Sequence, residues 1–247
     1  LLYGICGTTG ADTTHTYASF LWQPDDYYKN NFYEVYVYAG TNIGVNKRVT
    51  AWVLSTYLLT VHSAYAAACD ASSYIELHHV FMEDDLRKAI NLGIESAARS
   101  YLLDKIDDTI TLVADQFEYT LPAGIDYVSK VITEETADGG IFDDSDTIDT
   151  RTWRLISPRK IKLHEDYYSI TAGKDLRIEG QGRQALVDDD ADIIYLQPDW
   201  LKAKAITQLP VNKIQSNQLD LVYAQAVRDS AIIPKNSPYP DAQKVVE

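Results

Sequence analysis

The sequence has little cysteine and no long apolar run, and each shortage excludes a class of protein. Only two cysteines, Cys6 and Cys69, occur among 247 residues. They cannot form the disulfide framework of a small secreted protein, so a reducing compartment is expected. No apolar run reaches the ~18–20 residues that a membrane-spanning helix needs, and no signal peptide is recognisable. Because the sequence begins at Leu1, we expect residues to be missing from its N-terminus.

Basic residues are also in short supply. The chain has 22 Lys and Arg against 36 Asp and Glu, which gives a formal net charge of −14. This balance argues against a protein that coats nucleic acid or binds an anionic membrane, because both need basic patches. The acidic balance is still compatible with a protein that surrounds passing DNA and repels it. We therefore expect no membrane partner.

The charges are unevenly distributed along the chain. Residues 104–150 hold 13 acids and 2 bases, whereas residues 151–183 hold 8 bases and 4 acids. Two neighbouring blocks of opposite sign predict either two solvated loops, which is the more common case, or two surfaces that pair across a subunit contact.

Tyrosine is the abundant aromatic residue, with 18 tyrosines against 5 phenylalanines. A tyrosine side chain combines an apolar ring with a polar tip, which suits strands and hydrated contact surfaces. The excess favours a protein that contacts other proteins.

The clearest predicted elements lie between residues 81 and 131. Apolar side chains recur there at helical spacing, with carboxylates in the first turn, and predict a main helix over about 83–103. The repeat consists of Leu86, Ile90, Ile94, Ala97 and Tyr101. Further along, Phe117, Tyr119 and Leu121 alternate with polar residues and predict a half-buried strand.

Short β-prone runs separated by turn residues predict two antiparallel β modules, each a small sandwich or barrel. The first occupies residues 13–80, with strands at Tyr33–Tyr38, Lys47–Val53, Leu58–His62 and Ser73–His78. The second has strands at Phe117–Leu121, Val128–Thr133, Arg151–Ile156 and Ile193–Leu196, and a hairpin of Tyr167–Thr171 with Leu176–Glu179. Leu1–Cys6 is predicted to be the end of a helix.

Two further helices are predicted near the C-terminus, at Trp200–Leu209 and Ser216–Ser230, before a proline-containing extended tail at 233–247. The expected fold class is α+β, in which helical segments carry the two β modules. The expected domains are an inserted β module at 13–80, a core formed by 1–12 and 81–232, and the tail.

No motif predicts catalysis or a cofactor. Gly180, Gly182 and Ala185 fit the spacing of a dinucleotide-binding loop, but no helical pattern follows to hold a pyrophosphate. The acid-rich segments 143–149 and 188–190 do not match a calcium loop, and the cysteines and histidines lack zinc-ligand spacing. We therefore expect no metal, no cofactor and no enzymatic activity.

The order of features resembles head–tail connector proteins, also called adaptor or neck proteins, of tailed bacteriophages. The chain departs from compact adaptors in its large β insertion ahead of the main helix. The resemblance extends over the helix Asp84–Leu103, Asp107–Leu112, Phe117–Pro122, Val128–Val131, Trp153, Leu176–Glu179 and Asp192–Leu201. Leu21–Tyr28, Ala39–Gly44 and Arg48–Thr50 are similar to a small β module inserted into phage structural proteins.

This resemblance implies a non-enzymatic virion protein, assembled in the host cytoplasm and located in the neck. It would form a homo-oligomeric ring, expected to be twelvefold, that docks on the portal protein, contacts further neck or tail proteins, and lets DNA pass without sequence-specific binding. The C-terminal extension would reach the portal. Its candidate partner-binding residues are Ile233, Pro234, Pro238, Tyr239, Pro240, Val245 and Val246.

Two alternatives stay open at this point. One is another tail or baseplate component of the virion. The other is a β-rich protein that recognises a host receptor by binding, or even cleaving, glycans. Its sugars would stack on aromatic rings such as Trp22, Tyr27 and Tyr28.

Overall fold

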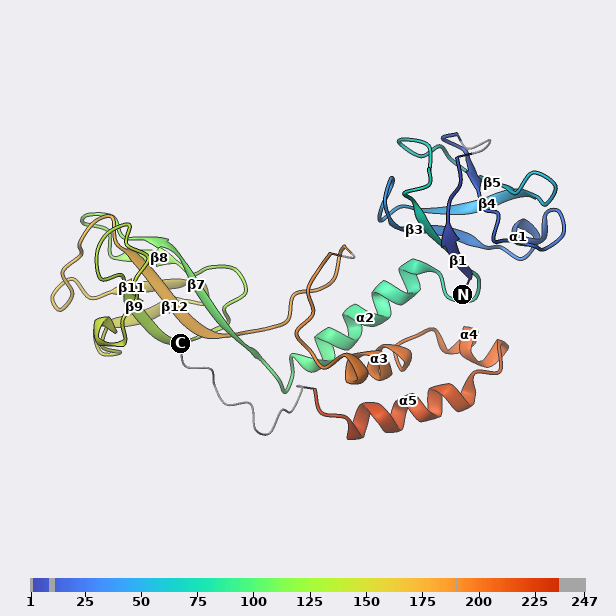
Figure 1. Ribbon diagram of the computed structural model, residues 1–247. Helices are drawn as coiled ribbons and strands as arrows, with labels where there is room; N and C mark the ends of the chain where they lie inside the picture. The colour runs from blue at the N-terminus through green and yellow to red at the C-terminus, as the bar shows by residue number, and fades with distance from the viewer. Residues whose placement is uncertain (1, 9–11, 190, 236–247) are drawn as a thin grey trace. The chain divides into compact units, whose positions relative to one another are not determined.

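The structure is a computed structural model that describes residues 2–8, 12–189 and 191–235 (Figure 1). The described chain is mostly β, with twelve strands in three sheets and five short α-helices that make it 22% helical. The expected helix-led α+β fold is therefore wrong. The described residues divide into two compact units, unit 1 (1–93, 187–193 and 197–247) and unit 2 (94–186 and 194–196). The predicted domain boundaries stay a prediction.

Unit 1 contains a curled, six-stranded antiparallel sheet that forms a half-barrel. The strand order is β1-β6-β3-β4-β5-β2. The strands are β1 (Leu2–Ile5), β2 (His15–Tyr17), β3 (Glu34–Ala39), β4 (Asn46–Val53), β5 (Leu58–Val61) and β6 (Tyr74–His78), and a short helix, α1 (Tyr27–Asn30), lies between β2 and β3.

Alternation of apolar side chains explains this sheet. Val35 and Val37 on β3, like Ile75 and Leu77 on β6, are buried in one core, as expected where side chains two residues apart share a face. The four strands predicted between residues 33 and 78 are confirmed. The predicted helix end at Leu1–Cys6 is wrong, because β1 pairs with β6 along its whole length.

The remaining helices of unit 1 come from distant parts of the sequence. They are α2 (Glu83–Ala97), which continues into unit 2, α3 (Pro198–Ile206), α4 (Val211–Ser216) and α5 (Asp220–Ile232). α2 and α3 approach closely at Gly93, where an added Cβ would lie 3.0 Å from Cδ1 of Leu201. Lys213 on α4 forms an ion pair of 2.5 Å with Asp85 on α2.

Unit 2 contains two three-stranded antiparallel sheets around a second core. Their orders are β7-β12-β9 and β10-β11-β8. The strands are β7 (Leu103–Thr111), β8 (Glu118–Thr120), β9 (Tyr127–Thr133), β10 (Trp153–Ser157), β11 (Lys160–Leu163) and β12 (Asp175–Gly182), with a 3₁₀ turn, η1 (Asp144–Asp146), in the acidic segment.

Several predicted elements of unit 2 need correction. The main helix ends at Ala97 and the chain enters β7 at Leu103, so the last turn predicted as helix is not helical. β12 pairs with β7 and β9 rather than with residues 167–171, which are not a strand. Residues 193–196 are also irregular. Local patterns failed here because the partners of β12 lie 40 or more residues away.

Strands from the two charge blocks lie next to each other in these sheets. β12, from residues 151–183, pairs with β7 and β9 from residues 104–150, and the basic β11 lies beside β8. Arg177 on β12 approaches Asp108 on β7 to 3.5 Å, and Arg183 approaches Asp126 to 3.5 Å. Part of the charge is thus compensated inside one chain.

Candidate partner-binding surface

The predicted C-terminal site is only partly described. Ile233 and Pro234 lie in the described part of the chain, whereas Pro238, Tyr239, Pro240, Val245 and Val246 lie outside the described residues. Ile233 lines a groove between α3 and α5, and Pro234 is exposed. The next residue returns to α3, because the carbonyl oxygen of Lys235 accepts a hydrogen bond of 2.8 Å from the backbone N–H of Gln197.

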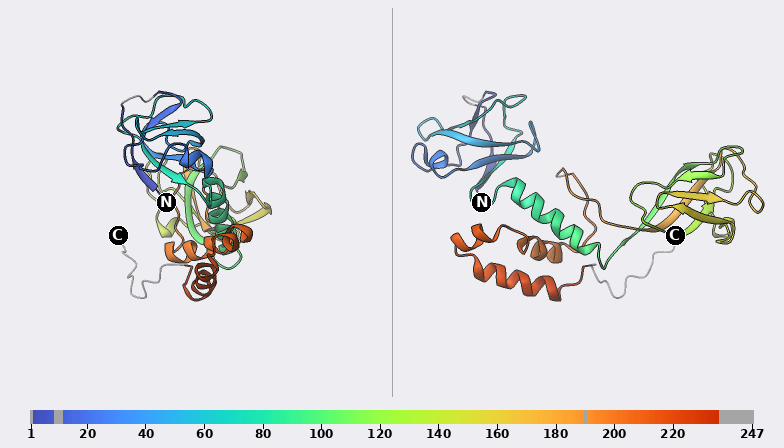
Figure 2. Two further views of the ribbon diagram at one scale, coloured as in Figure 1. Left: turned by 90° about the vertical axis from the view of Figure 1, so that its right-hand side faces the viewer. Right: turned by 180° about the vertical axis from the view of Figure 1, so that it is seen from behind.

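The base of this surface is the packing of α3 against α5, which lie side by side in Figures 1 and 2. Pro198 opens α3, where its missing N–H costs nothing. Trp200, 2% exposed, is buried between the helices, and its indole N–H donates a hydrogen bond of 3.1 Å to the carbonyl oxygen of Ser230. Trp200 therefore connects α3 to α5 both by packing and by a hydrogen bond.

Helix α5 mixes apolar residues with polar ones such as Asp220, Arg228 and Asp229, and Ala226 is its only buried residue among those described. Leu221 is 86% exposed and Ile232 is 80% exposed, and Val222 and Val227 are also exposed. Large apolar side chains that are exposed together on a surface mark interaction sites. The surface of α5 thus has the composition of a contact surface.

The groove beside α5 extends this surface and has a volume of about 560 Å³. Its lining combines six apolar residues with four polar ones, Asp199, Lys202, Gln225 and Asp229. Protein–protein contacts likewise combine apolar residues with polar ones. The apolar lining consists of Ala203, Ile206, Leu221, Val222, Ala226 and Ile233.

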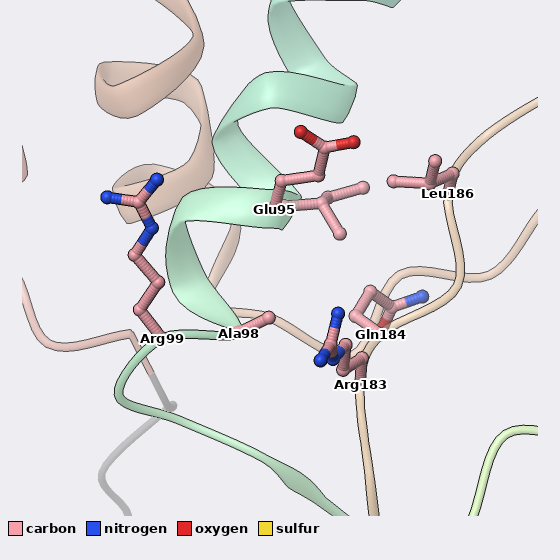
Figure 3. Close-up of a pocket in the computed structure, with 7 residues that line it drawn as sticks. Glu95, Ala98, Arg99, Arg183, Gln184 and Leu186 are labelled. Carbon is pink, nitrogen blue, oxygen red and sulfur yellow. The ribbon is translucent and has the colours of Figure 1, made fainter. Parts of the chain in front are cut away.

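A second cavity, of about 440 Å³, lies in unit 2 at the end of α2 (Figure 3). Arg183, Gln184 and Leu186 line one side, and Glu95 projects from the last turns of the helix. Gln184 is held in place because its amide oxygen accepts a hydrogen bond of 2.8 Å from the backbone N–H of Tyr195. Glu95 is the one carboxylate in the described lining, and Arg99 and Arg183 are its two basic residues.

The two cysteines meet in the core of the half-barrel. Cys6 and Cys69 are both buried and free, and their thiols are hydrogen-bonded. The hydrogen bond from Cys6 lowers the pKa of Cys69, which also accepts from the amide of Asn42 at 3.5 Å, and the same bond raises the pKa of Cys6. Burial keeps this pair away from any substrate. Within the described ranges, no group of three or more Cys, His, Asp or Glu side chains is arranged to hold a metal.

The aromatic rings considered for sugar stacking have different positions. Tyr28 is fully buried and packs edge-on against Trp52, and Tyr27 packs partly against the same core. Trp22 is 70% exposed. Two of the three rings therefore serve the core, and one faces solvent.

The glycines that fit a dinucleotide loop have a structural explanation. A Cβ on Gly180 would lie 2.0 Å from the carbonyl oxygen of Tyr127, and one on Gly182 would lie 1.6 Å from that of Gly124. Both glycines lie inside β12, and no helix follows them directly. They allow two stretches of backbone to approach each other.

A buried carboxylate stabilises the acidic segment. Glu134 is 1% exposed and accepts hydrogen bonds from the backbone N–H of Asp175, at 3.0 Å, and from that of Gly140. These donors lower the pKa of Glu134 below its usual value of 4.5. The side chain thereby joins the start of β12 to the loop after β9.

The stability of unit 2 is expected to fall when Glu134 is protonated. Because the folded pKa lies below the unfolded one, the ionised carboxylate stabilises the fold above pH 4.5, and this contribution is lost as the pH falls through the lower folded value. Glu134→Gln should lower the urea midpoint at neutral pH and by less at about pH 3. The exposed neighbour Glu135 gives a matched control, Glu135→Gln. An equal loss at both pH values for Glu134→Gln would contradict this prediction.

Comparisons with known proteins leave the chain without an assigned family. It matches no protein-family model, and no curated protein is significantly similar to it. Within the described residues, no helix is long and apolar enough to cross a membrane. The candidate surface must therefore be interpreted from its own residues.

Sequence patterns predicted a single helix at Ser216–Ser230. The chain instead breaks after Ser216, and Gln218 has a positive φ of 57° between α4 and α5. The break was missed because Asn217 and Gln218 are a weaker turn signal than glycine or proline. Apolar residues on more than one side of α5, among them Val222 and Val227, were the available signal for an exposed contact surface.

Proposed function

We propose that this chain is a non-enzymatic structural protein of a tailed-bacteriophage virion, one copy in a ring that docks on the portal, extends the DNA channel and joins capsid to tail. The neck position comes from the sequence resemblance, which runs from α2 through unit 2 to α3. The twelvefold count has the same source.

The exposed surface of α5 is the observation that supports assembly. Leu221 and Val222 are exposed and line the same apolar groove, and contiguous exposed apolar surface marks interaction sites. Interfaces between identical chains are more apolar than other interfaces. A neighbouring copy of this chain is therefore the occupant that best fits α5 and the groove beside it.

The acidic balance and the position of the aromatic residues agree with this proposal. A net charge of −14 suits a channel wall that does not hold DNA as it passes. The glycan-binding alternative retains one exposed ring, Trp22, of the three considered.

Gold-labelled antibodies on native phage particles, viewed by negative-stain electron microscopy, test the proposal. Label at the head–tail junction is the expected result. Label at the tail tip would favour a baseplate component, and particles without label would overturn the virion assignment. Binding of the purified chain to a host polysaccharide would favour the receptor-recognition alternative.

A further inference from the structure

We infer that copies of this chain associate through unlike charged surfaces in unit 2, the basic β10–β11 hairpin of one copy meeting the acidic loop 135–149 of the next. This inference rests on the proposed function, because it assigns a contact between ring subunits. The α5 surface would be one contact between copies. The charged surfaces of unit 2 would be a second contact, which determines which faces of the two copies meet.

The basic hairpin carries more positive charge than its own chain neutralises. Residues 151–163 contain five bases and no acid. Two of the five have internal roles, since Arg151 pairs with Asp149 at 2.6 Å and Arg159 donates to backbone carbonyls such as that of Leu121 at 3.1 Å. Arg154, Lys160 and Lys162 form no ion pair within the described part of the chain.

These three cations share one face of the sheet. Arg154 lies directly opposite Lys162 in the β10–β11 register, and Lys160 lies two residues from Lys162, about 6.7 Å along the strand. Like charges directly opposite each other destabilise a sheet. Glu118 on β8, opposite Lys162, is the one carboxylate in these register rows. The face therefore keeps an excess of positive charge that an acidic partner would neutralise.

The acidic loop has the complementary excess. Residues 135–149 contain six carboxylates and no base. Three of these carboxylates have a partner within their own chain. Asp143 accepts a hydrogen bond of 2.7 Å from the backbone N–H of Ser145, Asp144 pairs with Lys130, and Asp149 pairs with Arg151. The other three are Glu135, Asp138 and Asp146, and they form no ion pair among the described residues.

Each charged surface also exposes apolar side chains. Leu155 and Ile156 are exposed on β10, an edge strand that pairs with β11 alone, and Ile141 is exposed in the acidic loop. An unpaired edge with apolar side chains is a ready docking site for another chain. Charge complementarity would select the matching face and suppress wrong pairings.

Unlike surfaces that meet between identical chains form a heterologous contact, which closes into a ring when the rotation allows it. DNA is the less favourable occupant, because three free cations cannot offset a chain of net charge −14 at physiological salt. The acidic loop would also keep its excess charge if DNA occupied the hairpin.

Two double variants of the full chain test this contact. Arg154→Glu with Lys162→Glu reverses the hairpin, and Glu135→Lys with Asp146→Lys reverses the loop. Each alone should weaken self-association about tenfold at low salt, measured by analytical ultracentrifugation. An equimolar mixture of the two variants should restore association. The acidic, reversed hairpin of one variant fits the basic, reversed loop of the other, and the native loop of the first fits the native hairpin of the second.

A control with the same change in net charge as the hairpin variant is Lys29→Glu with Lys88→Glu in unit 1, which should associate like the wild type. A wild-type chain that stays monomeric, a double variant that associates normally, or a mixture that stays dissociated would overturn the inference. If the hairpin variant lost duplex-DNA binding but still associated normally, the hairpin would instead be a contact for DNA. Gold label at the neck would leave the proposed function standing in each of these cases.

Discussion

Replacing Trp200 by alanine is expected to lower the free energy of unfolding by about 3–5 kcal/mol. The side chain is almost fully buried between α3 and α5, and its indole N–H bonds to Ser230. Truncation would leave a cavity the size of an indole and would remove the partner of that carbonyl. Urea unfolding followed by circular dichroism at 222 nm, about the helical minimum, measures the loss.

Trp22 provides the matched control for this change. It is the same residue type but 70% exposed, so Trp22→Ala should shift the free energy of unfolding by no more than about 0.5 kcal/mol. Similar losses for the two variants would show that α5 does not depend on Trp200. Because α5 carries the proposed contact surface, Trp200→Ala should also reduce assembly.

Replacing Leu221 by aspartate should weaken self-association on the order of 30-fold or more with little effect on folding. Leu221 is 86% exposed and lines the groove beside α5. An aspartate there would bring an unpaired charge into an apolar interface, which is costly when a neighbouring copy covers it. Sedimentation equilibrium of the wild type and the variant gives the ratio of dissociation constants.

Gln215→Asp is the control for Leu221→Asp, because Gln215 is exposed on α4 and lies outside the groove lining. It adds the same charge to the same group of helices. Equal effects of the two changes would mean that net charge, rather than coverage of α5, controls assembly. An unchanged association constant for Leu221→Asp would remove α5 from the interface.

The two proposed contacts respond differently to salt. Association through the hairpin and the acidic loop should weaken as ionic strength rises, because exposed charges are screened over about 10 Å at 0.1 M salt. Association through Leu221 should persist, because apolar burial does not depend on charge. The two sets of variants therefore separate the contributions.

Sequence patterns alone predicted four of the six strands of the half-barrel, β3 to β6, and the start of α2. There the information is local, since alternation at Val35 and Val37 or helical spacing at Leu86 and Ile90 identifies a buried face without knowledge of its partner. The opposite charges of residues 104–150 and 151–183 were also evident from the sequence. So was the absence of a helical pattern after Gly180, which argued against a dinucleotide-binding loop.

Tertiary structure decided the rest. The pairing of β12 with β7 and β9, the end of α2 at Ala97 and the irregular course of residues 167–171 depend on contacts between distant segments, which override local propensity. Burial separated Trp200 from Trp22, although the two residues are of the same type. The exposure of α5 and the unpaired charges at Arg154 and Glu135 likewise followed only from which neighbours each side chain has in space.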